Sequence, residues 1–312
     1  MGSIRAGGDT EATGRRRGGR DRKRGAPAAG KRPFRQPVMP YPPVELVSAD
    51  GLERIHKASL KVLAETGINV LHDEARQIMK RAGATVTQGE TLVRFDPDLI
   101  LETIATVPQQ FTLHARNPEH NLVIGGDKMA FCLMASAPNS SCLDRGRRSG
   151  NHEDYRNFLK IGQHHAIVHA LGGYPVEPVD IHPSIRHLDC ISDYITLTDK
   201  AYNVYSLGKE RIADAIEMTR IGHGLTRDQL RRQPSVFTII NTNSPLQLDI
   251  PMMQGIIDMS SMGQPVVITP FTLSGAMAPV TIPGALVLQN AEALAGIAFS
   301  QMVNPGAPAM YG

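Results

Sequence analysis

Residues 235–270 of the chain read SVFTIINTNSPLQLDIPMMQGIIDMSSMGQPVVITP. The runs at Val236–Ile240 and Val266–Thr269 are short, apolar and rich in β-branched residues, as is typical of strands buried on both faces. Between them, residues 250–262 follow a helical pattern that ends at Gly263. A strand, a helix and a second strand in this order predict a βαβ unit with parallel strands.

The same alternation extends from Met129 to the end of the chain. Strand-like runs occupy residues 129–136, 167–171, 202–207, 236–240, 266–269 and 309–311. Helical patterns separate them at residues 151–165, 185–198, 209–221, 250–262 and 282–303. Because no GxGxxG motif follows any strand, a dinucleotide-binding sheet is disfavoured. The pattern predicts an α/β fold of the (β/α)8 TIM-barrel type, with about six strands present in residues 127–312.

The last strand-like run, Ala309–Tyr311, has only one residue after it. We therefore expect a barrel that is truncated before its last two strands. Such a chain would leave two strand edges unpaired, so an isolated fragment of this length is expected to be unstable and inactive.

Two further regions precede the predicted barrel. Residues 1–44 form a Gly- and Pro-rich tail that holds most of the basic excess, with eleven Lys or Arg against three Asp or Glu in residues 1–36. Such a composition predicts disorder and a solvated tail, with nucleic-acid binding the less favoured reading. Residues 45–126 read as an accessory α+β subdomain, with a helix from Asp50 to Gly67, a second helix at Asp73–Arg81, a hairpin, and a third helix from Asp96.

Composition excludes several protein classes. No run of about 18 apolar residues is present, which argues against a membrane-spanning segment. The three cysteines, Cys132, Cys142 and Cys190, are irregularly spaced and contain no CxxC pair. We therefore expect a cytoplasmic protein without a disulfide framework.

Residues 233–312 contain no Lys, Arg or His, and their only charges are Asp249, Asp258 and Glu292. The loops after the fourth and fifth strands are polar without being charged, which is poorly suited to a phosphate or carboxylate and better suited to a neutral or cationic ligand. Aromatic rings in such loops would contact an onium group, although packing is the commoner role of any one ring. The candidate residues for binding are Asn241, Asn243, Thr269, Phe271, Tyr174 and Tyr311.

Four segments of this region resemble one known family. They are NTNSPL at 241–246, SGAMAPVT at 274–281, LQNAEALAG at 288–296 and NPGAPAMYG at 304–312. In this order they resemble the trimethylamine methyltransferase family. The resemblance implies a (β/α)8 barrel that moves a methyl group from trimethylamine or a quaternary amine, such as a betaine, to the cobalt of a corrinoid carried by a separate protein.

Under that resemblance, Asn241, Asn243 and Thr269 would steady the substrate, and Gln289 and Glu292 lie on one face of the last helix. Glu292 would supply negative charge near the cation or, alternatively, form an ion pair or hydrogen bond behind the strands. The resemblance places the catalytic residues beyond Gly312, including the pyrrolysine found in some members, and implies no metal bound by this chain itself.

Several alternatives remain open. A zinc site is disfavoured, because a site in a barrel would take its ligands from several strand ends. Neither candidate set does so, whether His164, His165 and His169 or His182, His187 and Cys190. A non-catalytic barrel that binds an onium ligand is a second alternative. A lyase or aldolase is disfavoured because no Lys follows the fourth, fifth or sixth strand. The helices at 250–262 and 282–303 carry few charges, which predicts coverage by another subunit of a homo-oligomer or by a missing segment.

Overall fold

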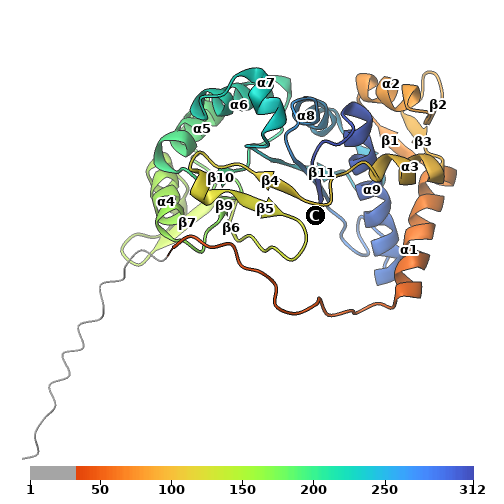
Figure 1. Ribbon diagram of the computed structural model, residues 1–312, viewed down its shortest axis with the longest axis horizontal. Helices are drawn as coiled ribbons and strands as arrows, with labels where there is room; N and C mark the ends of the chain where they lie inside the picture. Colours follow the sequence, from red (N-terminus) through yellow and green to blue (C-terminus); the bar gives the residue numbers. More distant parts are fainter. Residues whose placement is uncertain (1–32) are drawn as a thin grey trace, which may run out of the picture. The chain divides into compact units, whose positions relative to one another are not determined.

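The computed structural model describes residues 33–312, and residues 34–312 form one compact unit. Most of the predicted basic tail lies outside the described residues. Each secondary-structure element below is named as in Figure 1.

Six parallel strands follow one another in sequence order. They are β6 (Cys132–Leu133), β9 (Ala170–Leu171), β10 (Ala201–Tyr202), β11 (Thr238–Thr242), β13 (Val266–Pro270) and β14 (Ala309–Tyr311). Neighbouring strands pair in parallel within two three-stranded groups, and a single parallel bridge between Asn203 and Phe237 joins the groups. The α/β class is therefore confirmed. A closed barrel is not found within residues 33–312, so the TIM-barrel prediction is not confirmed.

Helices alternate with these strands. They are α4 (His152–His164), α5 (Arg186–Leu197), α6 (Lys209–Gly222), α7 (Arg227–Arg232), α8 (Ile250–Ser261) and α9 (Ile282–Val303) (Figure 1). Additional short elements interrupt the alternation, namely β7 (Asn139–Cys142), β8 (Gly146–Ser149) and β12 (Gln247–Leu248).

Two glycines allow α8 and α9 to lie close to the strands. A Cβ atom on Gly255 of α8 would lie 1.8 Å from the Ser206 hydroxyl, and one on Gly296 of α9 would lie 2.8 Å from Ile268. Ile240 and Ile268 are fully buried on this side. Successive side chains along a strand point to opposite faces. The residues that follow Ile240 and Ile268 in sequence, Asn241 and Thr269, therefore face away from these helices.

A hairpin covers the amino ends of several strands. It consists of β4 (Phe111–Leu113) and β5 (Leu122–Ile124), which pair in an antiparallel manner. Leu113 and Leu122 form a separate apolar cluster with Ala170, Ala201 and Phe237, which lie at or just before the starts of β9, β10 and β11. The predicted boundary at residue 126 stays a prediction.

The N-terminal elements pack onto the last helix. They are α1 (Ala49–Lys61), the π-helix η1 (Val62–Thr66), β1 (Ile68–Val70), α2 (Asp73–Arg81), β2 (Thr85–Val86), β3 (Leu92–Arg94) and α3 (Pro97–Ile104). Both α1 and α3 contact α9, while β1 pairs with β3 and, in parallel, with β12. This packing gives α9 an apolar environment within one chain. By length and composition α9 would also pass for a membrane span, yet more than half of its apolar window is buried here.

Lys200, at the start of β10, is a buried cation that caps a helix. Its Nζ donates to the carbonyls of Gly162 (2.7 Å) and His165 (2.9 Å) at the end of α4. Burial lowers the pKa of Lys200 to about 8, and the nearby Asp199 only partly opposes this shift.

The pKa of Lys200 predicts a pH dependence of stability. The pKa of Lys200 is about 8 in the folded protein, whereas the pKa of lysine in an unfolded chain is about 10.4. Between these two pH values the unfolded chain therefore binds more protons than the folded one. The free energy of unfolding of the wild type, minus that of Lys200→Met, should therefore increase with pH across this window. Urea unfolding at pH 7.5, 8.5 and 9.5 measures the difference, and a constant or falling value would contradict the assignment.

Candidate functional site

The loop after β11 is held by a buried carboxylate on α9. Glu292 is fully buried and accepts hydrogen bonds from the Thr242 hydroxyl, the Ser244 hydroxyl (2.7 Å) and the Leu246 amide (2.7 Å). The bond between Ser244 and Pro245 is cis. No basic side chain pairs with Glu292 within residues 33–312. The carboxylate therefore satisfies the donors of one loop, and this is the hydrogen-bonding alternative that the sequence left open.

Two of the predicted residues meet at the carboxyl ends of neighbouring strands. Asn241 and Thr269 are register partners in β11 and β13, and the Thr269 hydroxyl donates to Asn241 Oδ1 (2.8 Å). They lie on the face turned away from α8 and α9, since Ile240 and Ile268 face those helices. The space beside them is narrow, because a Cβ atom on Gly312 would lie 2.2 Å from Thr269. Asn241 thus offers an uncharged amide at the end of the strands.

The other predicted residues of this region lie apart from that pair. Asn243 is exposed, and its backbone amide donates to the backbone carbonyl of Gln247 (2.9 Å). Phe271 is 58% exposed in the loop after β13. Tyr311 turns toward α9, where its hydroxyl donates to Asn290 Oδ1 (3.3 Å). Gln289 is half-buried on α9.

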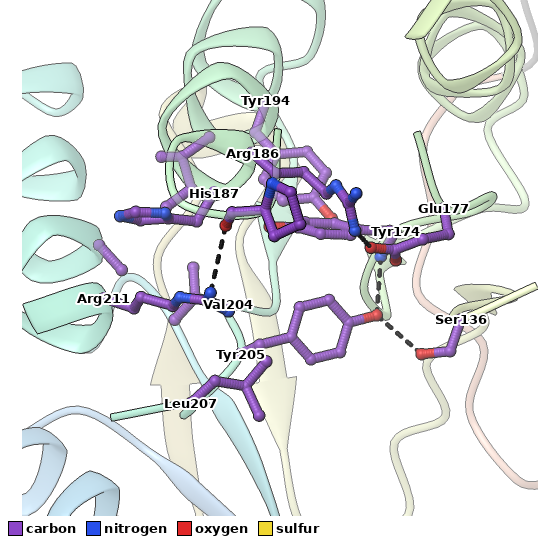
Figure 2. A pocket seen from close by; sticks show the side chains of 13 residues that line it. Ser136, Tyr174, Glu177, Arg186, His187, Tyr194, Val204, Tyr205, Leu207 and Arg211 are labelled. Carbon is purple, nitrogen blue, oxygen red and sulfur yellow. Dashed lines mark hydrogen bonds and ion pairs between the residues drawn. The ribbon is translucent and has the colours of Figure 1, made fainter. Parts of the chain in front are cut away.

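Tyr174 lies in a different place, in a cavity of about 260 Å3 bounded by α5, α6 and the segments that follow β9 and β10 (Figure 2). Its ring is buried and meets the Tyr205 ring edge-on, with the ring centres 4.7 Å apart. The Tyr205 hydroxyl accepts from the Tyr174 amide (3.1 Å) and shares a hydrogen bond with the Ser136 hydroxyl (2.8 Å). These contacts join the ends of β6, β9 and β10.

Tyr205 and Ser136 were not predicted from the sequence. A signal was present in the glycine pair that ends β9. A Cβ atom on Gly173 would lie 2.5 Å from the Tyr205 hydroxyl, and the φ angle of Gly173 is +142°, where a side chain is strained. Glycine in a strand often marks such a close approach.

This cavity is lined by charged side chains, whereas residues 233–312 contain no Lys, Arg or His. Arg186 pairs with Glu177 (2.5 Å), and Arg211 donates to the Pro183 carbonyl (3.1 Å) (Figure 2). His187 Nε2 lies 2.9 Å from a carboxylate oxygen of Asp214. The two regions at the strand ends therefore differ in electrostatic character.

Two polar atoms beside the cavity have no hydrogen-bond partner within the described residues, namely the Tyr194 hydroxyl and His187 Nδ1. Tyr194 is fully buried, and burial raises its pKa well above the ordinary value, so its hydroxyl stays protonated. An unsatisfied buried hydroxyl costs about 1–3 kcal/mol.

The histidines considered for zinc make other contacts. His169 bonds to the Phe131 amide and the Arg35 carbonyl, and His182 bonds to Ser184. No group of three or more His, Cys, Asp or Glu side chains in residues 33–312 is arranged to hold a metal ion.

Comparison with known proteins relates this chain to one family of enzymes. The family model described as trimethylamine methyltransferase (MTTB) matches residues 13–312. Glycine betaine methyltransferase of Desulfitobacterium hafniense is 35% identical over 271 residues, covering 87% of this chain and 56% of the relative. Trimethylamine methyltransferase MttB of the same species is 29% identical, covering 85% and 53%. Trimethylamine methyltransferase MttB1 of Methanosarcina mazei is 27% identical, covering 86% and 55%. The chain thus spans about half the length of these curated relatives.

Proposed function

The chain belongs to the trimethylamine methyltransferase family, and on this premise we propose that its full-length protein transfers a methyl group from trimethylamine or a quaternary amine to the cobalt of a corrinoid protein. The family predicted from the four motifs is confirmed. The names of the relatives support a methyltransferase, and the lyase and aldolase alternatives gain no support.

The uncharged Asn241–Thr269 pair is the observation that carries the proposal for the methyl donor. A methyl group leaves readily from nitrogen only when the nitrogen is cationic, so the donor site must tolerate a positive charge. The loops after β11 and β13 contain no Lys, Arg or His that would repel it. The exposed Phe271 ring would add about 0.5–2 kcal/mol of cation–π attraction if it closed over an onium group.

In this proposal the corrinoid belongs to a partner protein and supplies the nucleophile. The neutral amide and hydroxyl groups of Asn241 and Thr269 suit an amine. The role assigned to this chain is to orient the amine so that one methyl group faces the partner, a contribution of positioning.

We also propose that the six parallel strands belong to a (β/α)8 barrel. Their sequential order and the helix between successive strands support this, as does the greater length of the relatives. In such barrels the reacting groups lie at the carboxyl ends of the strands, where Asn241 and Thr269 lie.

The test is a methyl-transfer assay with the full-length protein, its reduced corrinoid protein, and trimethylamine or glycine betaine as donor. The expected result is a demethylated amine detected by mass spectrometry, together with the absorbance change of a methylated corrinoid. Binding of the amine without any transfer would instead support the non-catalytic onium-binding alternative.

Asn241→Leu should reduce kcat/KM for the preferred amine by about tenfold or more, because an amide that contacts the donor is replaced by an apolar group. The control is Asn157→Leu on α4, an exposed position remote from the strand ends. An Asn241→Leu enzyme with unchanged kcat/KM and an unchanged melting temperature would remove Asn241 from the donor site.

A further inference from the structure

The cavity between α5 and α6 has an apolar wall. Ile191, Val204 and Ala215 line one side and are buried. The volume of about 260 Å3 is below the range usual for drug-sized ligands, so a small molecule is the appropriate occupant. The cavity is built by the segments after β9 and β10, whereas Asn241 and Thr269 lie on β11 and β13.

One cation at this cavity lacks an acidic partner. Arg186 is paired with Glu177, so the two charges compensate each other. Arg211 forms no salt bridge within residues 33–312 and donates only to the Pro183 carbonyl. A guanidinium group carries five N–H donors, so most of those of Arg211 remain available. Such a group binds a planar carboxylate through two parallel hydrogen bonds.

The unsatisfied atoms also indicate a ligand. The buried Tyr194 hydroxyl is protonated and has no hydrogen-bond partner within 3.5 Å in the described chain, and His187 Nδ1 has none either. The hydroxyl of the neighbouring Tyr155 donates to the Cys190 carbonyl (3.0 Å). Buried polar groups in folded proteins are almost always hydrogen-bonded to protein, water or ligand. An oxygen atom of a bound molecule would satisfy Tyr194.

We propose that this cavity binds a small organic monocarboxylate with an apolar body. Arg211 receives the carboxylate, Tyr194 donates to an oxygen of the ligand, and the body packs on the apolar wall. Because Glu177 neutralises Arg186, Arg211 is the one cation at the cavity without an acidic partner in the described chain, and a single positive charge matches a monocarboxylate better than the higher charge of inorganic phosphate. The proposal concerns a site apart from the Asn241–Thr269 pair and does not depend on methyl transfer.

Isothermal titration calorimetry of the protein with benzoate tests this proposal, with benzamide as the neutral analogue of the same shape and inorganic phosphate as the competing anion. We expect benzoate to bind at least about tenfold more tightly than benzamide, because the guanidinium favours the charged group. Phosphate should not displace it. Equal binding of benzoate and benzamide, or displacement of benzoate by equimolar phosphate, overturns the proposal.

Two variants locate the binding. Arg211→Gln should weaken benzoate binding about tenfold or more, whereas Arg232→Gln, at an exposed position of α7, should leave it unchanged. Tyr194→Phe removes only an unpaired hydroxyl, so it should weaken binding without lowering the melting temperature, and it decides the matter if Arg211→Gln does not fold. Unchanged benzoate affinity in Tyr194→Phe and in folded Arg211→Gln contradicts the assignment. A negative methyl-transfer assay would leave these results unaffected.

Discussion

Glu292→Ala is expected to lower the free energy of unfolding by about 4 kcal/mol, because it orphans three donors at once. The hydroxyls of Thr242 and Ser244 and the amide of Leu246 all donate to this one carboxylate. Hydrogen bonds to a charged group contribute about 1.5–3 kcal/mol each, and the cost of burying the carboxylate offsets part of their sum. Since single domains are stable by only about 5–15 kcal/mol, this loss is a large fraction of the total.

Comparison of three variants by urea denaturation would test the role of Glu292. Glu292→Gln keeps one acceptor oxygen and should cost less than half as much as Glu292→Ala. Glu102→Ala, at an exposed position of α3, should change the free energy of unfolding by less than about 0.5 kcal/mol. If Glu292→Ala were as stable as Glu102→Ala, the three hydrogen bonds would not hold the loop.

The same substitution separates two roles for Glu292. If the carboxylate only holds the loop, Glu292→Gln should retain most of the affinity for a quaternary amine, because the loop stays in place. If it also attracts the cation, Glu292→Gln should weaken amine binding while neutral ligands are unaffected. The buried position and the three donors favour the first result.

The parallel strands were predictable because each is a short apolar run. The predicted run Val266–Thr269 differs from β13 by one residue, and the predicted Ala309–Tyr311 coincides with β14. The first run was predicted at residues 129–136, but β6 contains only Cys132–Leu133. Apolar composition indicates a strand, whereas the length of its pairing depends on a neighbour far away in sequence.

The polar elements were harder to predict. The antiparallel pair β7 and β8 contains little apolar sequence, and its ordering involves Asp154, which accepts from Ser140 (2.6 Å) and Arg148 (2.5 Å). Helix α7 was missed although Thr226 and Gln229 form a capping box at its start. Such a box is readable in sequence, but six residues are too few to show a periodic pattern.

The sequence predicted which residues lie at the strand ends but not which of them lie together. Asn241 and Thr269 lie near the carboxyl ends of the neighbouring parallel strands β11 and β13, and this topology brings them together, as their positions in the chain implied. Tyr174 lines a cavity away from that pair because it follows β9, on the other side of the Asn203–Phe237 bridge. Sequence indicates that a residue follows a strand, but the direction of its side chain depends on register.

Gln264→Leu is the second substitution expected to have a large effect, with a loss of about 4 kcal/mol in the free energy of unfolding. The side chain is fully buried and forms four hydrogen bonds of 3.3 Å or less to the backbone, with a fifth, longer one to the Gln233 carbonyl (3.5 Å). Its Oε1 accepts from the amides of Ser235 (2.8 Å) and Val236 (3.3 Å), and its Nε2 donates to the carbonyls of Leu230 (2.7 Å) and Met262 (2.9 Å). Leucine has a similar volume but leaves the Ser235 and Val236 amides and the Met262 carbonyl without this partner, while the Leu230 carbonyl keeps only the Gln233 amide (3.1 Å).

These four bonds tie the ends of α7 and α8 to the entry of β11, so their loss should also disturb the strand that carries Asn241. Gln264→Glu distinguishes hydrogen bonding from packing, because a carboxylate accepts from the two amides but repels the two carbonyls. It should therefore be at least as destabilising as Gln264→Leu, whereas Gln88→Leu, in an exposed turn, should be nearly neutral. A Gln264→Leu protein that unfolds at the wild-type urea concentration would show that packing, and not this amide, secures the start of β11.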